Sequence, residues 1–166
     1  ERVVRRSNAL MKEAYGRDFS YGEATARGSG VSGWVSAAAT TVGLGFFVGS
    51  MALGPTRWLL QKLVLPEPGE GPSREFIESG FFNLKLVGTG SRDDTDDFVV
   101  RGRVADDKDP GYGSTARMLA ESAMCLAFDE VDDEWTVDGG VLTPASAMGM
   151  TLVERLREAG MTFEIE

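Results

Sequence analysis

Five residues in the last third of the chain carry groups that could bind a substrate: Tyr112, Gly113, Ser114, Thr115 and Thr143. Tyr112 lies between two glycines just before a predicted helix, where its phenol could donate a hydrogen bond to a carbonyl oxygen. The amides of 113–115 could bind a carboxylate or carbonyl oxygen, because a helix N-terminus carries partial positive charge. The alternative is structural, with a tyrosine packed in a turn and hydroxyls that cap helices.

Weaker candidates lie nearby. Thr143 and Ser146 fit a helix start, with Thr143 as the N-cap and Pro144 as the first helical residue. Three arginines could bind the anionic end of a substrate or could be solvated surface charges: Arg101, Arg103 and Arg117. No residue has the setting of a general acid, so no catalytic residue is assigned.

The chain contains no histidine, which removes several kinds of chemistry. A His-based triad, an ordinary catalytic zinc site and an imidazole base are excluded within it. Its single cysteine, Cys125, excludes an internal disulfide and is typical of a reducing compartment. Because Cys125 falls in an apolar helical stretch, we expect a buried structural thiol and not a nucleophile.

Charge and length bound the function further. The net charge of −9 argues against nucleic-acid binding, and 166 residues suffice for one domain with a sizeable core. Acidic residues cluster at 93–97, 106–107 and 129–134. Such runs are typical of solvated loops, with a weak cation site as the alternative, and we expect no metal.

The hydrophobic pattern predicts an α+β fold, with an antiparallel or mixed sheet covered on one face by helices. Strands are expected at 19–26, at 82–90 and 97–104 as a hairpin with an acidic loop, and at 161–165, with a short edge segment at 135–137. Helices are expected at 1–15, at 74–79 between Ser73 and Gly80, after Gly111 with Ser114 or Thr115 as cap, and at 145–159 before Gly160.

Residues 28–56 form an unusual uncharged segment that is rich in Gly, Ala, Ser and Thr. It is long enough to cross a bilayer, but its glycines and the break at Gly54-Pro55 favour a buried or partner-facing helix. A membrane-surface contact and a true span remain alternatives. Residues 57–64 form a basic amphipathic stretch, so 28–65 together suit a lipid surface or a hydrophobic partner.

The glycines at 43, 45 and 49 superficially match a dinucleotide-binding fingerprint. Their spacing is wrong by one residue, no acidic residue follows at the required distance, and no strand precedes them. We therefore expect no cofactor-binding residues in this chain.

Several stretches, taken in order, resemble the C-terminal domain of the saccharopine dehydrogenase-like oxidoreductases, especially the bacterial trans-acting enoyl reductases. They are Tyr-Gly-Glu at 21–23, Leu-Pro-Glu-Pro-Gly-Glu-Gly-Pro-Ser at 65–73, Gly-Phe-Phe-Asn-Leu-Lys-Leu-Val-Gly at 80–88, Asp-Pro-Gly-Tyr at 109–112, Thr-Ala-Arg-Met-Leu-Ala-Glu-Ser-Ala at 115–123, Gly-Gly-Val-Leu-Thr-Pro-Ala at 139–145 and Leu-Val-Glu-Arg-Leu at 152–156. The order and spacing make the resemblance specific.

The resemblance implies that residues 1–166 are the substrate-binding and association domain of a longer protein. An N-terminal Rossmann domain, absent here, would bind NADP, and the C-terminal helix would return to it. The start at Glu1, without an initiator methionine, agrees with this expectation. The family also implies a lipid-like substrate and a homodimer.

The sequence therefore predicts part of an NADP-dependent oxidoreductase that reduces a lipid-like enoyl or acyl intermediate, inactive as this chain alone. We expect a cytoplasmic protein, either free or peripheral at the inner face of the membrane. The alternative is a non-catalytic scaffold subunit that docks on a membrane or protein complex through residues 28–65.

Overall fold

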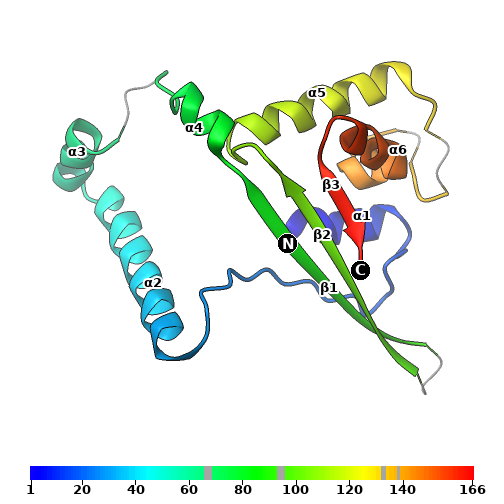
Figure 1. Cartoon of the computed structure of the whole chain (residues 1–166), viewed down its shortest axis with the longest axis horizontal. Helices are drawn as coiled ribbons and strands as arrows, with labels where there is room; N and C mark the ends of the chain where they lie inside the picture. Colours follow the sequence, from blue (N-terminus) through cyan, green and yellow to red (C-terminus); the bar gives the residue numbers. More distant parts are fainter. Residues whose placement is uncertain (66–68, 93–95, 132–133, 138) are drawn as a thin grey trace. The chain divides into compact units, whose positions relative to one another are not determined.

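The computed structural model describes residues 1–65, 69–92, 96–131, 134–137 and 139–166 (Figure 1). These residues form two compact units, one made of 1–21 with 72–166 and the other of 22–71. The first unit, called unit 1, is discontinuous in sequence, because the second, unit 2, is inserted into it. The predicted acidic hairpin loop at 93–95 lies outside the described residues.

Unit 1 combines helices with a three-stranded antiparallel sheet, as the α+β prediction required (Figure 1). Its elements are α1 (Arg2–Leu10), α4 (Arg74–Ser79), β1 (Phe82–Arg92), β2 (Asp96–Asp106), α5 (Gly113–Phe128), α6 (Pro144–Glu158) and β3 (Thr162–Ile165). The strand order is β1-β2-β3, so the hairpin and the terminal strand are both confirmed.

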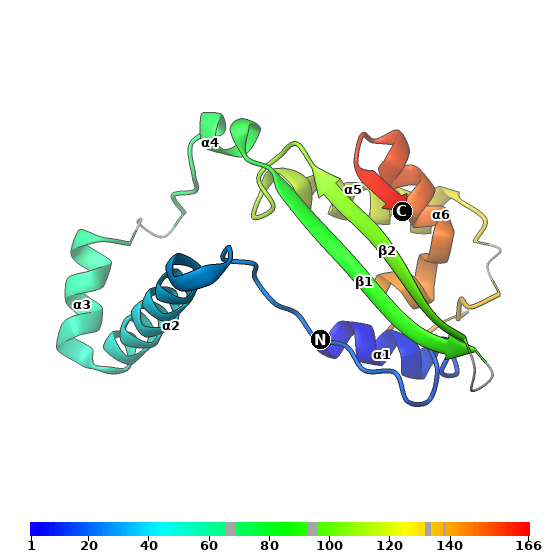
Figure 2. The same ribbon diagram turned by 60° about the horizontal axis from the view of Figure 1, so that its bottom comes forward.

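The core of unit 1 lies on one face of this sheet. Helices α5 and α6 supply buried Cys125, Met148, Leu152 and Leu156, and Met161 follows α6. Phe82 and Phe163 pack against this cluster from the sheet. Figure 2 shows both helices on the same side of the strands. The buried position of Cys125 confirms the structural thiol, and burial, followed by the nearby Asp129, raises its pKa.

Unit 2 contains two helices, α2 (Gly30–Ala52) and α3 (Gly54–Leu63), in the residues that the structure describes. Leu53 alone separates them, with extended backbone, and Pro55 opens α3. The predicted break at Gly54-Pro55 is therefore confirmed. Gly33 is the sole buried residue of α2. The backbone of Gly28 covers it so closely that a Cβ at Gly33 would lie 2.7 Å from the Gly28 carbonyl oxygen.

Three local predictions were wrong. Residues 19–26 form no strand; Phe19 instead packs between Tyr15, whose ring is tilted at 5.2 Å, and Tyr21, whose ring is stacked at 6.4 Å. Alternation alone does not make a strand when no neighbouring strand pairs with it. The first helix ends at Leu10, not at 15. The segment 135–137 does not join the sheet, and the Val137 amide donates to the carbonyl of Ser146 at 2.8 Å.

Candidate functional site

A buried carboxylate organises the end of β2, where four of the candidate residues lie. The Asp106 side chain is fully buried and accepts from Ser114 Oγ at 2.6 Å and from Arg117 Nη1 at 2.5 Å. The Asp107 amide donates to the same carboxylate at 2.9 Å. Burial alone would raise the pKa of Asp106, but the Ser114 hydroxyl, the Asp107 amide and Arg117 together hold it below its ordinary value.

This network corrects two expectations. Asp106 is not part of a solvated acidic loop, and Arg117 is mostly buried in an ion pair, not a solvated charge. The Ser114 hydroxyl is engaged with Asp106 and also lies 3.0 Å from the carbonyl of Lys108. Its role in this structure is to join the start of α5 to the end of β2.

The N-cap residue of α5 is Tyr112, whose side chain makes no capping hydrogen bond, and not the predicted Ser114 or Thr115. The helix begins at Gly113, and the Asp109 carboxylate accepts from the Tyr112 amide at 2.7 Å. The Ser114 amide donates to the Asp109 carbonyl at 2.9 Å. The Asp-Pro-Gly turn places this carboxylate ahead of the helix, where it accepts from the amide of the N-cap residue.

Tyr112 and Thr115, which follow this turn, differ in the availability of their hydroxyl groups. The Tyr112 side chain is 55% exposed, which leaves its phenol accessible to a ligand. Thr115 Oγ1 donates to the carbonyl of Pro110 at 2.6 Å. Gly113 is required by packing, because a Cβ there would lie 3.0 Å from Lys108 Cβ and 3.2 Å from Ile77 Cγ2 of α4.

Thr143 belongs to a second cluster at the start of α6. It is the N-cap, and it forms a reciprocal capping box with Ser146, which confirms the predicted helix start. Its Oγ1 also lies 2.8 Å from Ser7 Oγ of α1. Both hydroxyls of the box are buried. No described hydrogen bond connects this cluster with Tyr112 or its neighbours, so the five predicted residues fall into two groups.

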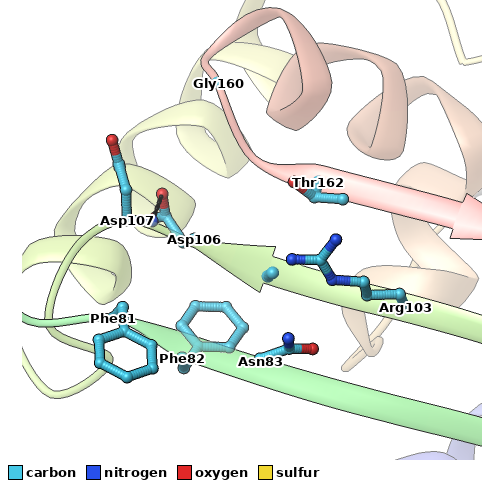
Figure 3. Close-up of a pocket in the computed structure, with 9 residues that line it drawn as sticks. Phe81, Phe82, Asn83, Arg103, Asp106, Asp107, Gly160 and Thr162 are labelled. Atoms are coloured by element: carbon cyan, nitrogen blue, oxygen red, sulfur yellow. Dashed lines mark hydrogen bonds between the residues drawn. The ribbon is translucent and has the colours of Figure 1, made fainter.

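A shallow hollow of about 320 Å³ lies at the end of the sheet (Figure 3). Asn83 and Thr162 both pair with Ala105, so these side chains and that of Arg103 share the sheet face opposite the core. Phe81 and Asp107 also line the hollow. Arg103 lies 3.8 Å from Glu164, and its buried Nε has no hydrogen-bond partner among the described residues.

The face of the hairpin that points away from Asn83 and Arg103 carries an apolar strip. Leu86, Gly88 and Gly90 of β1 pair with Gly102, Val100 and Phe98 of β2, on the face that carries Phe82. Leu86, Val100 and Phe98 are 46%, 43% and 48% exposed, so the helices do not cover this part of the face. The Phe98 ring lies across Gly90, since a Cβ there would approach it to 2.6 Å.

Sequence reasoning missed Asp106, Asp109 and Ser7 as organising residues. Asp109 carried a signal, because Asp before Pro-Gly favours a turn whose side chain accepts backbone amides. The sequence around Asp106 carried little signal of its burial, since acidic runs are commonly solvated. The partner of Thr143 is 136 residues away, and no local pattern indicates such a contact.

Comparison with known proteins identifies relatives of this chain. Trans-acting enoyl reductases of Mycobacterium tuberculosis and Mycobacterium bovis are 40% identical to it over 170 residues, which is 96% of this chain and 37% of theirs. The trans-acting enoyl reductase of Mycobacterium ulcerans is 37% identical over the same shares. A further Mycobacterium tuberculosis relative is 39% identical over 98% of this chain.

The chain is a partial-length homologue of the trans-acting enoyl reductases. It spans 37–38% of the length of the curated relatives that it matches. No protein-family model matches it, and no solved structure matches it. The homology therefore rests on these curated relatives alone.

Enoyl reductases in general take their hydride from a nicotinamide cofactor. In this trans-acting enoyl reductase homologue, Gly43, Gly45 and Gly49 lie inside α2 and not in a turn between a strand and a helix. Their amides are engaged in helical hydrogen bonds, so they cannot cradle a pyrophosphate. These three glycines thus do not form a dinucleotide-binding loop, and no catalytic step is assigned through one.

Proposed function

We propose that this chain is the substrate-binding and association part of an NADP-dependent enoyl reductase that acts on a lipid-like enoyl or acyl intermediate. The observation that carries the proposal is the 40% identity to trans-acting enoyl reductases over 96% of this chain. In that role the chain orients the acyl group and excludes water, while residues outside this chain hold the nucleotide.

Three features of unit 1 suit such a substrate. The apolar strip of Leu86, Val100 and Phe98 offers accessible contact area for an acyl chain. Tyr112 presents an accessible phenol that can donate to a thioester carbonyl. On the other sheet face, Arg101 and Arg103 are two residues apart and can hold the anionic end of a carrier.

The decisive test uses the full-length protein. NADPH oxidation is followed with a trans-2-enoyl thioester as substrate, and nucleotide binding is measured by calorimetry. We expect turnover that requires both components, with NADPH bound in the absence of substrate. Lack of both turnover and nucleotide binding would overturn the enzymatic proposal. Turnover with NADH alone would correct the cofactor but keep the reaction.

The acyl-binding role of the strip is tested by chain length. Replacing both Leu86→Ser and Phe98→Ser should raise KM for a long-chain enoyl thioester about tenfold, because the apolar contact is lost, and should leave a short-chain substrate unaffected. The matched control, Val87→Ser with Val99→Ser, changes exposed residues of the opposite sheet face. Equal effects on long and short substrates would contradict the proposed contact.

Tyr112 is tested separately. Tyr112→Phe removes only the hydroxyl of an exposed side chain, so stability should not change, and kcat/KM should fall about ten- to a hundredfold if the phenol donates to the reacting carbonyl. Tyr15→Phe is the control, since the Tyr15 hydroxyl contacts the Met11 sulfur. Unchanged kcat/KM in Tyr112→Phe would assign Tyr112 to the turn alone.

A non-catalytic docking subunit is the second candidate, favoured by the exposed apolar surface of α2. It predicts that the full-length protein binds a partner without nucleotide binding or turnover. The same nucleotide-binding measurement therefore separates the two candidates.

A further inference from the structure

Helix α2 has no polar face and no core to pack against in unit 2. It is long and apolar enough to cross a membrane by length and composition, and the most apolar window has none of its residues buried. Val31, Trp34, Val42, Phe46 and Val48 are 54% exposed or more. A helix that is apolar all round requires an apolar surrounding on every side.

Three of the five hydroxyl side chains of α2 form hydrogen bonds inside the helix. Thr40, Thr41 and Ser50 each donate to the carbonyl four residues earlier, at 2.8 to 2.9 Å. At the far end, Thr56 Oγ1 lies 2.5 Å from the Ser50 carbonyl and 3.0 Å from that of Leu53. These contacts reduce the polar groups that a lipid surrounding would leave unpaired.

Basic and aromatic residues lie where the helix pair would meet lipid headgroups. Between Arg27 and Lys62 the chain has three basic residues and no acidic one, whereas the whole chain carries a net charge of −9. The third basic residue is Arg57. In α3, Lys62 Nζ lies 5.1 Å from the centre of the Trp58 ring. Tryptophan with lysine or arginine is typical of the interface of an anionic membrane.

Contacts within unit 1 exclude a complete crossing of the bilayer by α2. Arg6 donates to the Val141 carbonyl at 2.6 Å, and Ser7 bonds with Thr143, so segments from both sides of unit 2 fold together. A single crossing by α2 would place those segments on opposite sides of the bilayer. Helix α3 has ten residues and a length of about 15 Å, half the hydrocarbon thickness, so it cannot return the chain.

We propose that unit 2 anchors the protein monotopically: α2 lies within one leaflet of an anionic bilayer, and α3 lies at the headgroups of the same leaflet. A helix of 23 residues is about 34 Å long and a leaflet core about 15 Å deep, so α2 lies at a shallow angle to the membrane plane. This inference does not depend on the proposed reaction.

The primary experiment is flotation of the full-length protein with vesicles of phosphatidylcholine and phosphatidylglycerol. Val42→Asp with Val48→Asp should lower the partition coefficient at least about a hundredfold, because carboxylates are costly in hydrocarbon. The matched control is Val87→Asp with Val99→Asp, the same change at 60% and 57% exposed valines of the hairpin, against 71% and 61% in α2. The control should float like the unaltered protein.

Electrostatic and contact tests follow in the same system. Arg57→Glu with Lys62→Glu should weaken binding about tenfold and remove its dependence on phosphatidylglycerol. A photoreactive benzophenone in place of Phe46 should crosslink to lipid, and one in place of Phe81 should not, although both side chains are over 75% exposed.

The one-sided arrangement is tested by trypsin added outside sealed vesicles. Cleavage at a site before α2, after Arg27, and at a site following it, after Arg57 or Lys62, with the α2 peptide retained in the vesicles, is the expected result. Protection of either site would indicate a crossing and overturn the monotopic proposal. Failure of the unaltered full-length protein to float, or equal flotation of both valine variants, would also overturn it and assign α2 to a protein partner or to the rest of its own chain. NADPH turnover is measured separately, so loss of anchoring and loss of activity are distinguishable.

Discussion

The two units place similar side chains in opposite surroundings. In unit 1, Leu152 and Leu156 lie in a core beneath the sheet at 8% and 5% exposure, whereas Leu44 of α2 is 62% exposed. The difference lies in periodicity. The apolar residues of α6 alternate with charged ones and form one buried face, but α2 has no charged residue at any position. An amphipathic pattern therefore indicates burial within the chain, and an all-round apolar pattern indicates burial by something else.

The largest predicted contrast is in the free energy of unfolding, when a leucine is replaced by alanine in each of the two units. Leu156→Ala should lower the free energy of unfolding by about 2–5 kcal/mol, because it leaves a cavity in the core. Leu44→Ala should change it by less than about 0.5 kcal/mol in water, since the side chain is exposed. Urea denaturation of the protein without lipid measures both. A comparable loss in Leu44→Ala would show that α2 is packed in solution.

The next contrast concerns charge. Arg117→Met leaves the buried Asp106 carboxylate without its ionic partner and should cost about 2–3 kcal/mol, less than a fully buried pair because the Arg117 side chain is 19% exposed. Arg57→Met should cost nearly nothing in water, because Arg57 makes no ion pair with the described residues. Equal costs for the two variants would show that the Asp106 network contributes nothing specific.

The Asp106 pair also predicts the acid side of the stability profile. The folded-state pKa of Asp106 is lowered, so its stabilisation is present above the unfolded carboxyl pKa of roughly 3.9 and is lost as pH falls through the folded value. In Arg117→Met the pKa of Asp106 rises, and the difference in unfolding free energy between variant and unaltered protein should shrink as pH decreases below that range. A difference independent of pH would assign the effect to packing.

Capping provides a smaller contrast. Thr143→Ala removes a capping box and leaves the buried Ser7 hydroxyl bonded to the Val3 carbonyl alone, which should cost about 1–2 kcal/mol. Thr143→Ser keeps the hydroxyl and should recover most of this loss. Ser29→Ala at the start of α2 should have almost no effect, because the Ser29 side chain makes no capping hydrogen bond. A substantial loss in Ser29→Ala would break the distinction between the units.

The sequence predicted those parts of the fold whose signals are local. The hairpin, the Thr143-Pro144 helix start and the Gly160 stop each depend on a few neighbouring residues with fixed backbone preferences. The wrong strand at 19–26 shows the limit, since alternation is present but a pairing strand is not. Whether a strand forms depends on residues distant in sequence.

The candidate site was less predictable because its organisation depends on long-range pairing. Ser114 and Thr115 have the right type for a cap, but the helix begins before them, at Gly113, with Tyr112 as the N-cap residue. Arg117 and Asp106 are 11 residues apart and belong to different elements, so their pairing follows from the angle between β2 and α5. The assignment of Tyr112, Gly113, Ser114, Thr115 and Thr143 to substrate binding stays a prediction.

The last contrast has opposite signs in the two units, and the single effect in α2 is the smallest of those predicted. Gly149 interrupts α6 with φ 50° and ψ −136°, a conformation that side chains disfavour, so Gly149→Ala should cost about 1–2 kcal/mol. Gly45 lies in regular helix, and a Cβ there meets no atom within 4 Å, so Gly45→Ala should stabilise α2 in water by about 0.5–1 kcal/mol. Circular dichroism melts and local hydrogen exchange in the two helices measure these effects. Destabilisation by Gly45→Ala would mean that a neighbour packs against the glycine surface of α2 in solution, and α2 would then have a protein partner before it meets lipid.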